Sequence, residues 1–119
     1  MIYKFRKYDN IRKEMIYFNF EDLCECQGIY NNCIKFDFKD VMQYTGRKDK
    51  NDKEIFEGDV MITNGEIKFL IVFEKEAFCT KFYSIGFKKV YTKSLFDDPK
   101  KYTIIGNRYE NPELLKDIE

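Results

Sequence analysis

Short segments in which apolar and polar residues alternate recur along the sequence, and this period-two pattern constrains the fold more than any other feature. In residues 2–8, Tyr3 and Phe5 fall on one face of an extended chain, and Lys4 and Arg6 fall on the other. Residues 15–20 and 33–38 repeat the pattern. Such alternation is typical of a strand with one buried face. Aromatic residues, all Phe or Tyr, make up 18% of the chain and also favour strands.

Turn residues separate these segments. Asn64-Gly65 is the strongest hairpin signal in the chain, because both residues accept the positive φ of a type I′ turn between residues 60–63 and 66–73. Asn51-Asp52 can form the same type of turn, although less comfortably than Asn-Gly would. A further strand is expected over residues 78–83, ahead of Gly86.

The C-terminal third is less regular. A helical turn is expected at residues 94–96, and residues 102–105 are expected to form a strand that stops at Gly106-Asn107. Asn111 followed by Pro112 has the residue types of a helix cap and a first helical position, which predicts one short C-terminal helix. Seven or more short strands with almost no helix predict a mainly β fold, built as a small barrel or sandwich.

Charge and hydropathy argue against several classes of protein. The 21 basic and 21 acidic residues give a net charge of zero, which argues against a sequence-independent nucleic-acid binder but leaves room for a local basic patch. No segment approaches the roughly 20 apolar residues of a membrane span. Residues 1–7 lack the apolar stretch of a signal peptide. We therefore expect a cytoplasmic protein that makes no contact with a membrane.

The four cysteines are Cys24, Cys26, Cys33 and Cys79. In a reducing cytosol they are expected to be free thiols. A structural zinc site would need all four, because the chain has no His, and the single-residue spacing between Cys24 and Cys26 is not typical of zinc ligands. The sequence therefore predicts no metal and no cofactor.

Catalytic chemistry finds little support. Without His, no Cys-His or Ser-His pair can form. Glu57 and Asp59 could act as an acid/base pair or hold a divalent cation if the segment is extended. The simpler interpretation is that Asp59 accepts a local hydrogen bond at a bend and Glu57 is solvated. Asp49, Asp52 and Glu54 alternate with lysines, which is typical of a solvated hairpin tip. An enzyme of unknown type stays a second alternative.

Nucleic-acid binding is the first alternative. Small barrels often present aromatic residues beside basic ones, and this sequence interleaves them. The competing interpretation is that the aromatic rings are core residues and the lysines solvate the opposite face of each strand. The residues that would contact nucleic acid are Arg47, Lys48, Lys81, Tyr83, Lys88, Lys89, Arg108 and Tyr109.

Residues 42–60 and 104–115, with a shorter stretch at 2–6 followed by Met15, resemble the YopX protein family of phages and prophages of bacteria. The resemblance spans nearly the whole chain. It implies a β-rich fold with an SH3-like barrel in the C-terminal part and a tendency to self-associate, and it supplies no catalytic or ligand residue. This sequence departs from the family pattern at Asp52, where Gly is usual, and at Arg47, where an apolar residue is usual. The residues to which we assign a structural role in this pattern are Tyr44, Gly46, Glu57, Gly58, Asp59, Gly106, Asn107, Asn111 and Pro112.

These observations predict an N-terminal β region over residues 1–44 and an SH3-like barrel over 45–119, which could also pack as one domain, 1–119. Twelve Phe and nine Tyr are many to hide in so short a chain. We therefore expect a homo-oligomer in which the N-terminal strands supply the interface. The predicted function is that of a phage or prophage accessory protein in the bacterial cytoplasm. It would act as a non-catalytic, self-associating protein-interaction module for an unknown host or phage protein.

Overall fold

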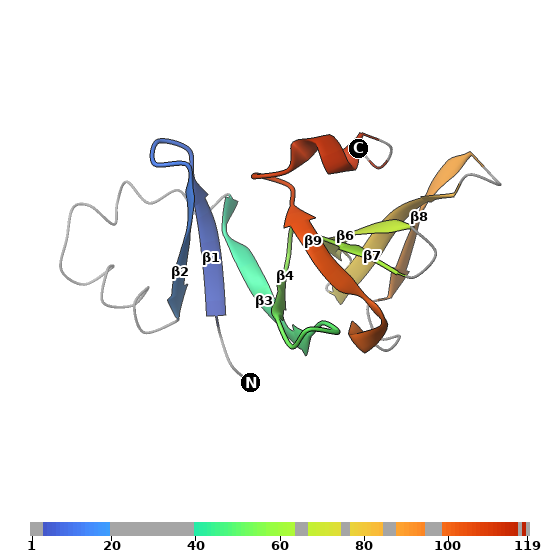
Figure 1. The fold of residues 1–119 in the computed structure, drawn as a ribbon, viewed down its shortest axis with the longest axis horizontal. Coiled ribbons are helices and arrows are strands. Elements are labelled where there is room, and N and C mark those ends of the chain that lie inside the picture. The colour runs from blue at the N-terminus through green and yellow to red at the C-terminus, as the bar shows by residue number, and fades with distance from the viewer. Residues whose placement is uncertain are drawn as a thin grey trace. The chain divides into compact units, whose positions relative to one another are not determined.

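The computed structural model describes residues 4–19, 40–63, 67–74, 77–84, 88–94, 99–116 and 118 (Figure 1). The chain divides into two compact units, residues 1–44 and 45–119. In chain order the described residues form β1 (Lys4–Asp9), β2 (Glu14–Asn19), β3 (Met42–Lys48), β4 (Glu54–Phe56), β5 (Asp59–Ile62), β6 (Lys68–Glu74), β7 (Ala77–Ser84), β8 (Lys89–Ser94), the 3-10 turn η2 (Pro99–Lys101), β9 (Thr103–Asn107) and the 3-10 turn η3 (Pro112–Leu115). The expected mainly β fold is confirmed.

The first unit is built on a β-hairpin. Strands β1 and β2 pair antiparallel from Lys4↔Asn19 to Asp9↔Glu14, and β1 also pairs with the start of β3. The Phe5 and Phe18 rings stack across the hairpin, with centroids 5.7 Å apart. The expected burial of the Phe5 face is only partial, because the buried side chain of β1 is Arg6, at 4% exposed. The strands expected at residues 2–8 and 15–20 are thus present, and the one expected at 33–38 lies outside the described residues.

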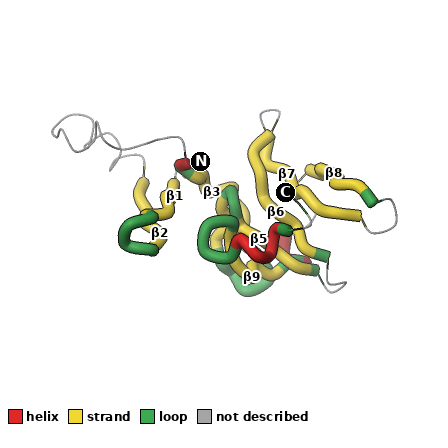
Figure 2. Tube along the Cα trace, turned by 90° about the horizontal axis from the view of Figure 1, so that it is seen from above, coloured by secondary structure: helices red, strands yellow, loops and turns green. Residues whose placement is uncertain are grey.

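The second unit contains a five-stranded antiparallel sheet in the order β8-β7-β6-β5-β9, in which β6, β7 and β8 lie side by side (Figure 2). The end of β3 and strand β4 belong to a separate sheet of order β2-β1-β3-β4. Strands β5 and β6 pair antiparallel from Val60↔Leu70 to Ile62↔Lys68, as the Asn64-Gly65 signal predicts. The connecting turn lies outside the described residues.

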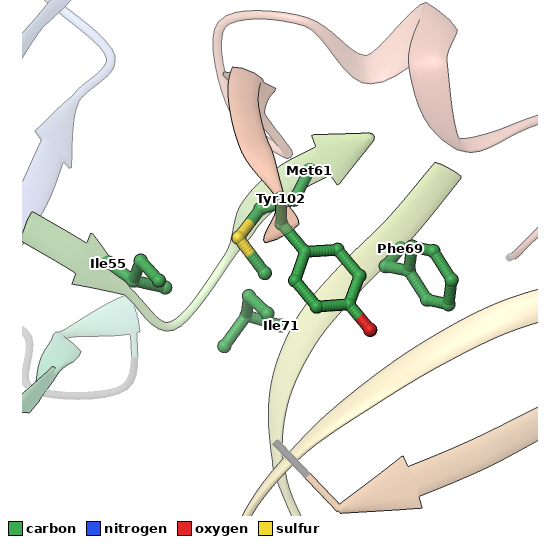
Figure 3. Close-up of a cluster of buried hydrophobic side chains, with 5 residues drawn as sticks. All are labelled: Ile55, Met61, Phe69, Ile71 and Tyr102. Atoms are coloured by element: carbon green, nitrogen blue, oxygen red, sulfur yellow. The ribbon is translucent and has the colours of Figure 1, made fainter. Parts of the chain in front are cut away.

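The five-stranded sheet buries apolar side chains on both faces, because neighbouring residues of β5 and β6 belong to different clusters. One cluster consists of Ile55, Met61, Phe69, Ile71 and Tyr102, and in Figure 3 the ring of Tyr102 lies between Met61 and Phe69. The other consists of Val60, Leu70, Val72, Leu115 and Ile118. Each such side chain contributes roughly 1.5–3 kcal/mol on burial. In the second cluster, the C-terminal residues Leu115 and Ile118 pack against one face of the sheet.

The turn at residues 49–53 differs from the expected type I′ turn. A type I′ turn needs positive φ at two central residues, and only Asp52, with φ of 65°, has it here. The Asp49 carbonyl accepts the Asp52 N–H at 3.0 Å, and the Asp49 N–H donates to the Lys53 carbonyl at 2.9 Å. The turn is therefore closed by a single left-handed residue.

The predicted short C-terminal helix is wrong: the described residues after β9 contain only the 3-10 turn η3. Asn111 makes no side-chain cap. Its Oδ1 instead accepts the Asn107 N–H at 3.2 Å, which turns the side chain back towards β9. Asn111, which the sequence predicts as a helix cap, thus closes the turn over residues 107–111 instead.

Two strands run through a glycine, and one strand was not predicted. Strand β3 continues through Gly46, whose φ of 82° accommodates a local twist without ending the strand. Strand β9 likewise runs through Gly106 to Asn107. Strand β8 was missed, and the helical turn expected at residues 94–96 fails at Ser94, which ends β8. Residues 95–98 lie outside the described part of the chain.

Candidate interaction surfaces

Asp49 is a buried structural anchor, not part of the solvated tip that its lysine neighbours predict. Its side chain is 0% exposed. Oδ1 accepts the N–H groups of Asn51 and Lys53, both at 2.9 Å, and Oδ2 accepts the Ile104 N–H, also at 2.9 Å. Hydrogen bonds to a charged group are each worth about 1.5–3 kcal/mol. This carboxylate therefore fastens the β3–β4 turn to β9 and is engaged by backbone donors.

The turn between β4 and β5 also uses its carboxylate structurally. Gly58 has φ of 87°, so the segment is not extended and the premise of a Glu57/Asp59 pair sharing one face does not hold. Asp59 is 2% exposed, and its Oδ2 accepts the Phe56 N–H at 2.8 Å. The Gly58 N–H donates to the Ile71 carbonyl at 2.8 Å. The simpler of the two interpretations, a carboxylate closing a bend, fits this geometry.

A network of amide side chains closes the turn after β9. Asn107 Oδ1 accepts the N–H groups of Tyr109 and Glu110 at 3.0 and 2.9 Å, and its Nδ2 donates to Glu110 Oε1 at 2.8 Å. A Cβ at Gly106 would lie 2.7 Å from Asn111 Cγ, so glycine permits this close approach. Four of the residues with predicted structural roles (Gly106, Asn107, Asn111 and Pro112) thus share one turn.

Within the described residues, no three His, Cys, Asp or Glu side chains gather where they could hold a metal ion. Cys79 on β7 is a free, half-buried thiol whose Sγ lies 3.7 Å from the Ala77 carbonyl oxygen. Cys24, Cys26 and Cys33 lie outside the described residues.

The basic and aromatic residues proposed for nucleic acid do not form one patch. Phe82 of β7 packs against the cluster that contains Phe69. Lys81 and Tyr83 alternate with Phe82 and therefore lie on the opposite face of the strand. Lys89 of β8 lies on the same face as Phe82, because Tyr91, two residues after Lys89, stacks against Phe82 with ring centroids 6.0 Å apart. Lys88 precedes β8 with φ of 52°.

The remaining four residues proposed for nucleic acid come from other elements. Arg47 and the exposed Lys48 end β3, whereas Arg108 and Tyr109 follow β9 and are half-buried. The Arg108 backbone N–H donates to the Gly58 carbonyl at 2.9 Å. Its Nε is buried and makes no hydrogen bond within the described part of the chain. Arg108 is therefore partly withdrawn from solvent.

Among the described residues, the two most exposed large apolar side chains lie on the β1–β2 hairpin. Ile11 at its tip is 94% exposed, and on β2 Tyr17 is 61% and Ile16 is 41% exposed. Alternation in the sequence predicts the face of Ile16 and Phe18 but assigns nothing to Tyr17 or Ile11. The sequence holds no signal that singles out Tyr17, because its exposure depends on how β2 pairs in the folded chain.

The molecule thus belongs to the class of mainly β proteins built from two small antiparallel sheets, and its buried acidic side chains serve turns. No helix among the described residues is both long and apolar enough to cross a membrane. The family model of the YopX protein matches residues 4–116, so the chain belongs to the YopX protein family. The predicted membership is confirmed.

A solved structure shares the fold over nearly its whole length. The crystal structure of protein EF1440 from Enterococcus faecalis is 25% identical in sequence, covers 98% of this chain and 99% of its own, and superposes with a TM-score of 0.50. Among curated proteins, no significant match was found.

Proposed function

We propose that this protein is a non-catalytic interaction module that self-associates through the β1–β2 hairpin. The observation that carries the proposal is the exposure of two adjacent apolar side chains, Ile16 and Tyr17, one on each face of β2, which lies at the edge of its sheet among the described strands. An edge strand presents backbone donors and acceptors that a second chain can extend, and exposed apolar residues there favour such pairing.

Among the described strands, β2, β4, β8 and β9 lie at sheet edges, and β2 and β8 differ in how they discourage pairing. Strand β8 carries Lys89 and Lys93, both exposed, and lysine at an edge opposes strand addition. Strand β2, with the sequence EMIYFN, contains no lysine. This difference favours β2 over β8 as the assembling edge, and β9, which also lacks lysine, is tested by the control variant below.

The proposal extends to the setting of the protein and to its fold type. Membership of the YopX protein family and the likeness to a bacterial protein support an accessory protein of phage or prophage origin that works in the cytoplasm of a bacterium. The five-stranded antiparallel sheet β8-β7-β6-β5-β9, with a register shift between Val60 and Met61, supports an SH3-like barrel over residues 45–119. A host or phage protein is the expected further partner.

Light scattering on a gel-filtration column tests the assembly. We expect a mass that is a multiple of 14.5 kDa at micromolar concentration. Ile16→Glu should reduce the mass to that of one chain, because a carboxylate at the interface would be buried without a partner. In the isolated chain the new Glu would lie opposite Lys7, its cross-strand neighbour, which keeps the hairpin folded.

Ile105→Glu is the matched control, because Ile105 lies on edge strand β9 and is 39% exposed, close to the 41% of Ile16. It should leave the mass unchanged. A wild-type mass of 14.5 kDa would refute self-association. If Ile105→Glu abolished assembly and Ile16→Glu did not, the interface would lie on the five-stranded sheet, and the assignment to β2 would be wrong.

A further inference from the structure

Charge is segregated along this neutral chain. Residues 77–96 contain four lysines, Lys81, Lys88, Lys89 and Lys93, and no Asp or Glu. The rest of the chain therefore holds 17 basic against 21 acidic residues. The net charge of zero is thus the sum of a basic segment and an acidic remainder. The local charge of residues 77–96 is positive, although the net charge of the chain is zero.

The basic segment is a two-stranded ribbon at the edge of the five-stranded sheet (Figure 2). Strand β7 pairs with β6 from Glu74↔Ala77 to Leu70↔Lys81, and with β8 from Cys79↔Ser94 to Ser84↔Lys89. The two registers overlap only between Cys79 and Lys81. Beyond Lys81, residues 82–84 of β7 pair with β8, and Phe82 also contacts Phe69 of β6, with ring centroids 5.2 Å apart. The ribbon is therefore two strands wide only at its outer end, from Tyr83 onward.

The lysines lie on both faces of this ribbon. Lys89 and Lys93 share a face with Tyr91, and Lys81 with its cross-strand partner Thr92 lies on the other. Lys88, Lys89 and Lys93 are exposed, and Lys81 is half-buried. A polyanion that lies along the ribbon can therefore reach lysines from either side without meeting a carboxylate of residues 77–96.

The aromatic side chains of the ribbon are already engaged within it. Tyr91 stacks on Phe82 at 6.0 Å with an interplanar angle of 28°, and the Lys89 ammonium lies over the Tyr91 ring, 5.6 Å from its centroid. The rings therefore hold the ribbon together and orient Lys89, which favours contact with phosphates over stacking of unpaired bases. Residues 77–96 contain no Arg, Asn or Gln, three of the side chains that read base edges by paired hydrogen bonds.

We propose that the β7–β8 ribbon docks on the phosphate backbone of double-stranded DNA without base specificity. A two-stranded β-ribbon has the width that the major groove of a duplex accepts, and lysines on its two faces can approach the phosphates that border the groove. This activity is independent of self-association through β2.

The salt dependence of binding tests the proposal on the full chain. Fluorescence anisotropy with a labelled duplex of about 20 base pairs, between about 50 and 200 mM salt, should show an affinity loss of about 150-fold if four phosphates are neutralised. The variant Lys88→Gln/Lys89→Gln should bind more weakly and lose only about 12-fold over the same range, since two contacts remain. Lys100→Gln/Lys101→Gln, which alters two adjacent exposed lysines of η2, should behave as the wild type.

The outcomes separate the alternatives. Undetectable wild-type binding at about 50 mM salt, or equal weakening by the two lysine pairs, would overturn the proposal. Tighter binding to single-stranded DNA of the same length would overturn the choice of a duplex, and displacement of the duplex by an equal charge concentration of polyglutamate would show a general polyanion site. Circular dichroism of each variant confirms folding, and light scattering shows whether assembly is unchanged. A loss of DNA binding with unaltered mass leaves the assembly proposal standing.

Discussion

Asp52 adopts a backbone conformation that L residues rarely occupy, with φ of 65°. Its side chain is 70% exposed and lies 3.6 Å from Lys100 Nζ, an ion pair whose lysine side chain is 63% exposed and which therefore contributes little to stability. The YopX resemblance, in which Gly is usual at this position, agrees with the geometry, because glycine adopts positive φ without a Cβ penalty.

Asp52→Gly should therefore be more stable than Asp52→Ala by about 1 kcal/mol. Both variants remove the ion pair with Lys100, so the comparison isolates the backbone term. Urea unfolding of the two variants measures the difference. Equal free energies of unfolding would show that the turn relaxes to a conformation without positive φ.

At the scale of elements, the β1–β2 turn depends on a charged side chain. Asp9 Oδ1 accepts the N–H groups of Ile11 at 2.9 Å and Arg12 at 3.2 Å, and the Asp9 carbonyl accepts the Lys13 N–H at 2.8 Å. The backbone hydrogen bonds from Arg12 and then Ile11 hold the pKa of Asp9 below its ordinary value of 3.8. The carboxylate form therefore stabilises the folded hairpin.

A lowered pKa in the folded state fixes the sign of the pH effect. The stabilisation is fully present above the unfolded pKa and is lost as the pH falls through the lower, folded pKa. Wild type should exceed Asp9→Asn in urea stability at neutral pH, and the two should converge as the pH falls from about 5 to about 2. A stability difference that stays constant over this range would contradict the role of the charge.

Sequence patterns predict some elements and miss others for physical reasons. Alternation locates β1, β2 and β7, and the Asn64-Gly65 turn signal locates β5 and β6, because each of these strands pairs with one that is near in sequence. Strand β8 has the sequence KVYTKS, in which Val90 and Tyr91 are adjacent, so only its pairing with β7 identifies it. Asp49 looks solvated among lysines, because its partner Ile104 is 55 residues away. Asn111 has the residue type of a helix cap, but its Oδ1 accepts a hydrogen bond from the Asn107 N–H instead.

At the scale of the whole molecule, both apolar clusters draw all their buried residues from positions 55–118. The division of the chain falls after Tyr44, so residues 45–119 retain every one of these side chains. In contrast, the described part of residues 1–44 contributes a hairpin and the start of β3, and an isolated hairpin is marginally stable in water.

A fragment of residues 45–119 should therefore unfold cooperatively in urea and keep a β-type circular dichroism spectrum. The complementary fragment 1–44 should show no cooperative transition, since so short a chain rarely folds without a disulfide or a metal. An unfolded 45–119 fragment would show that the second unit requires the first.

The hydrogen bonds of Asp49 also bear on the order in which a growing chain can fold. The turn that supplies two of its donors is complete once Lys53 has been synthesised, but Ile104, the third donor, arrives about fifty residues later. Sealing an ionised carboxylate away from water before that donor is in place costs several kcal/mol. We therefore expect that, during synthesis on the ribosome, the β3–β4 turn stays open to solvent until β9 has left the exit tunnel.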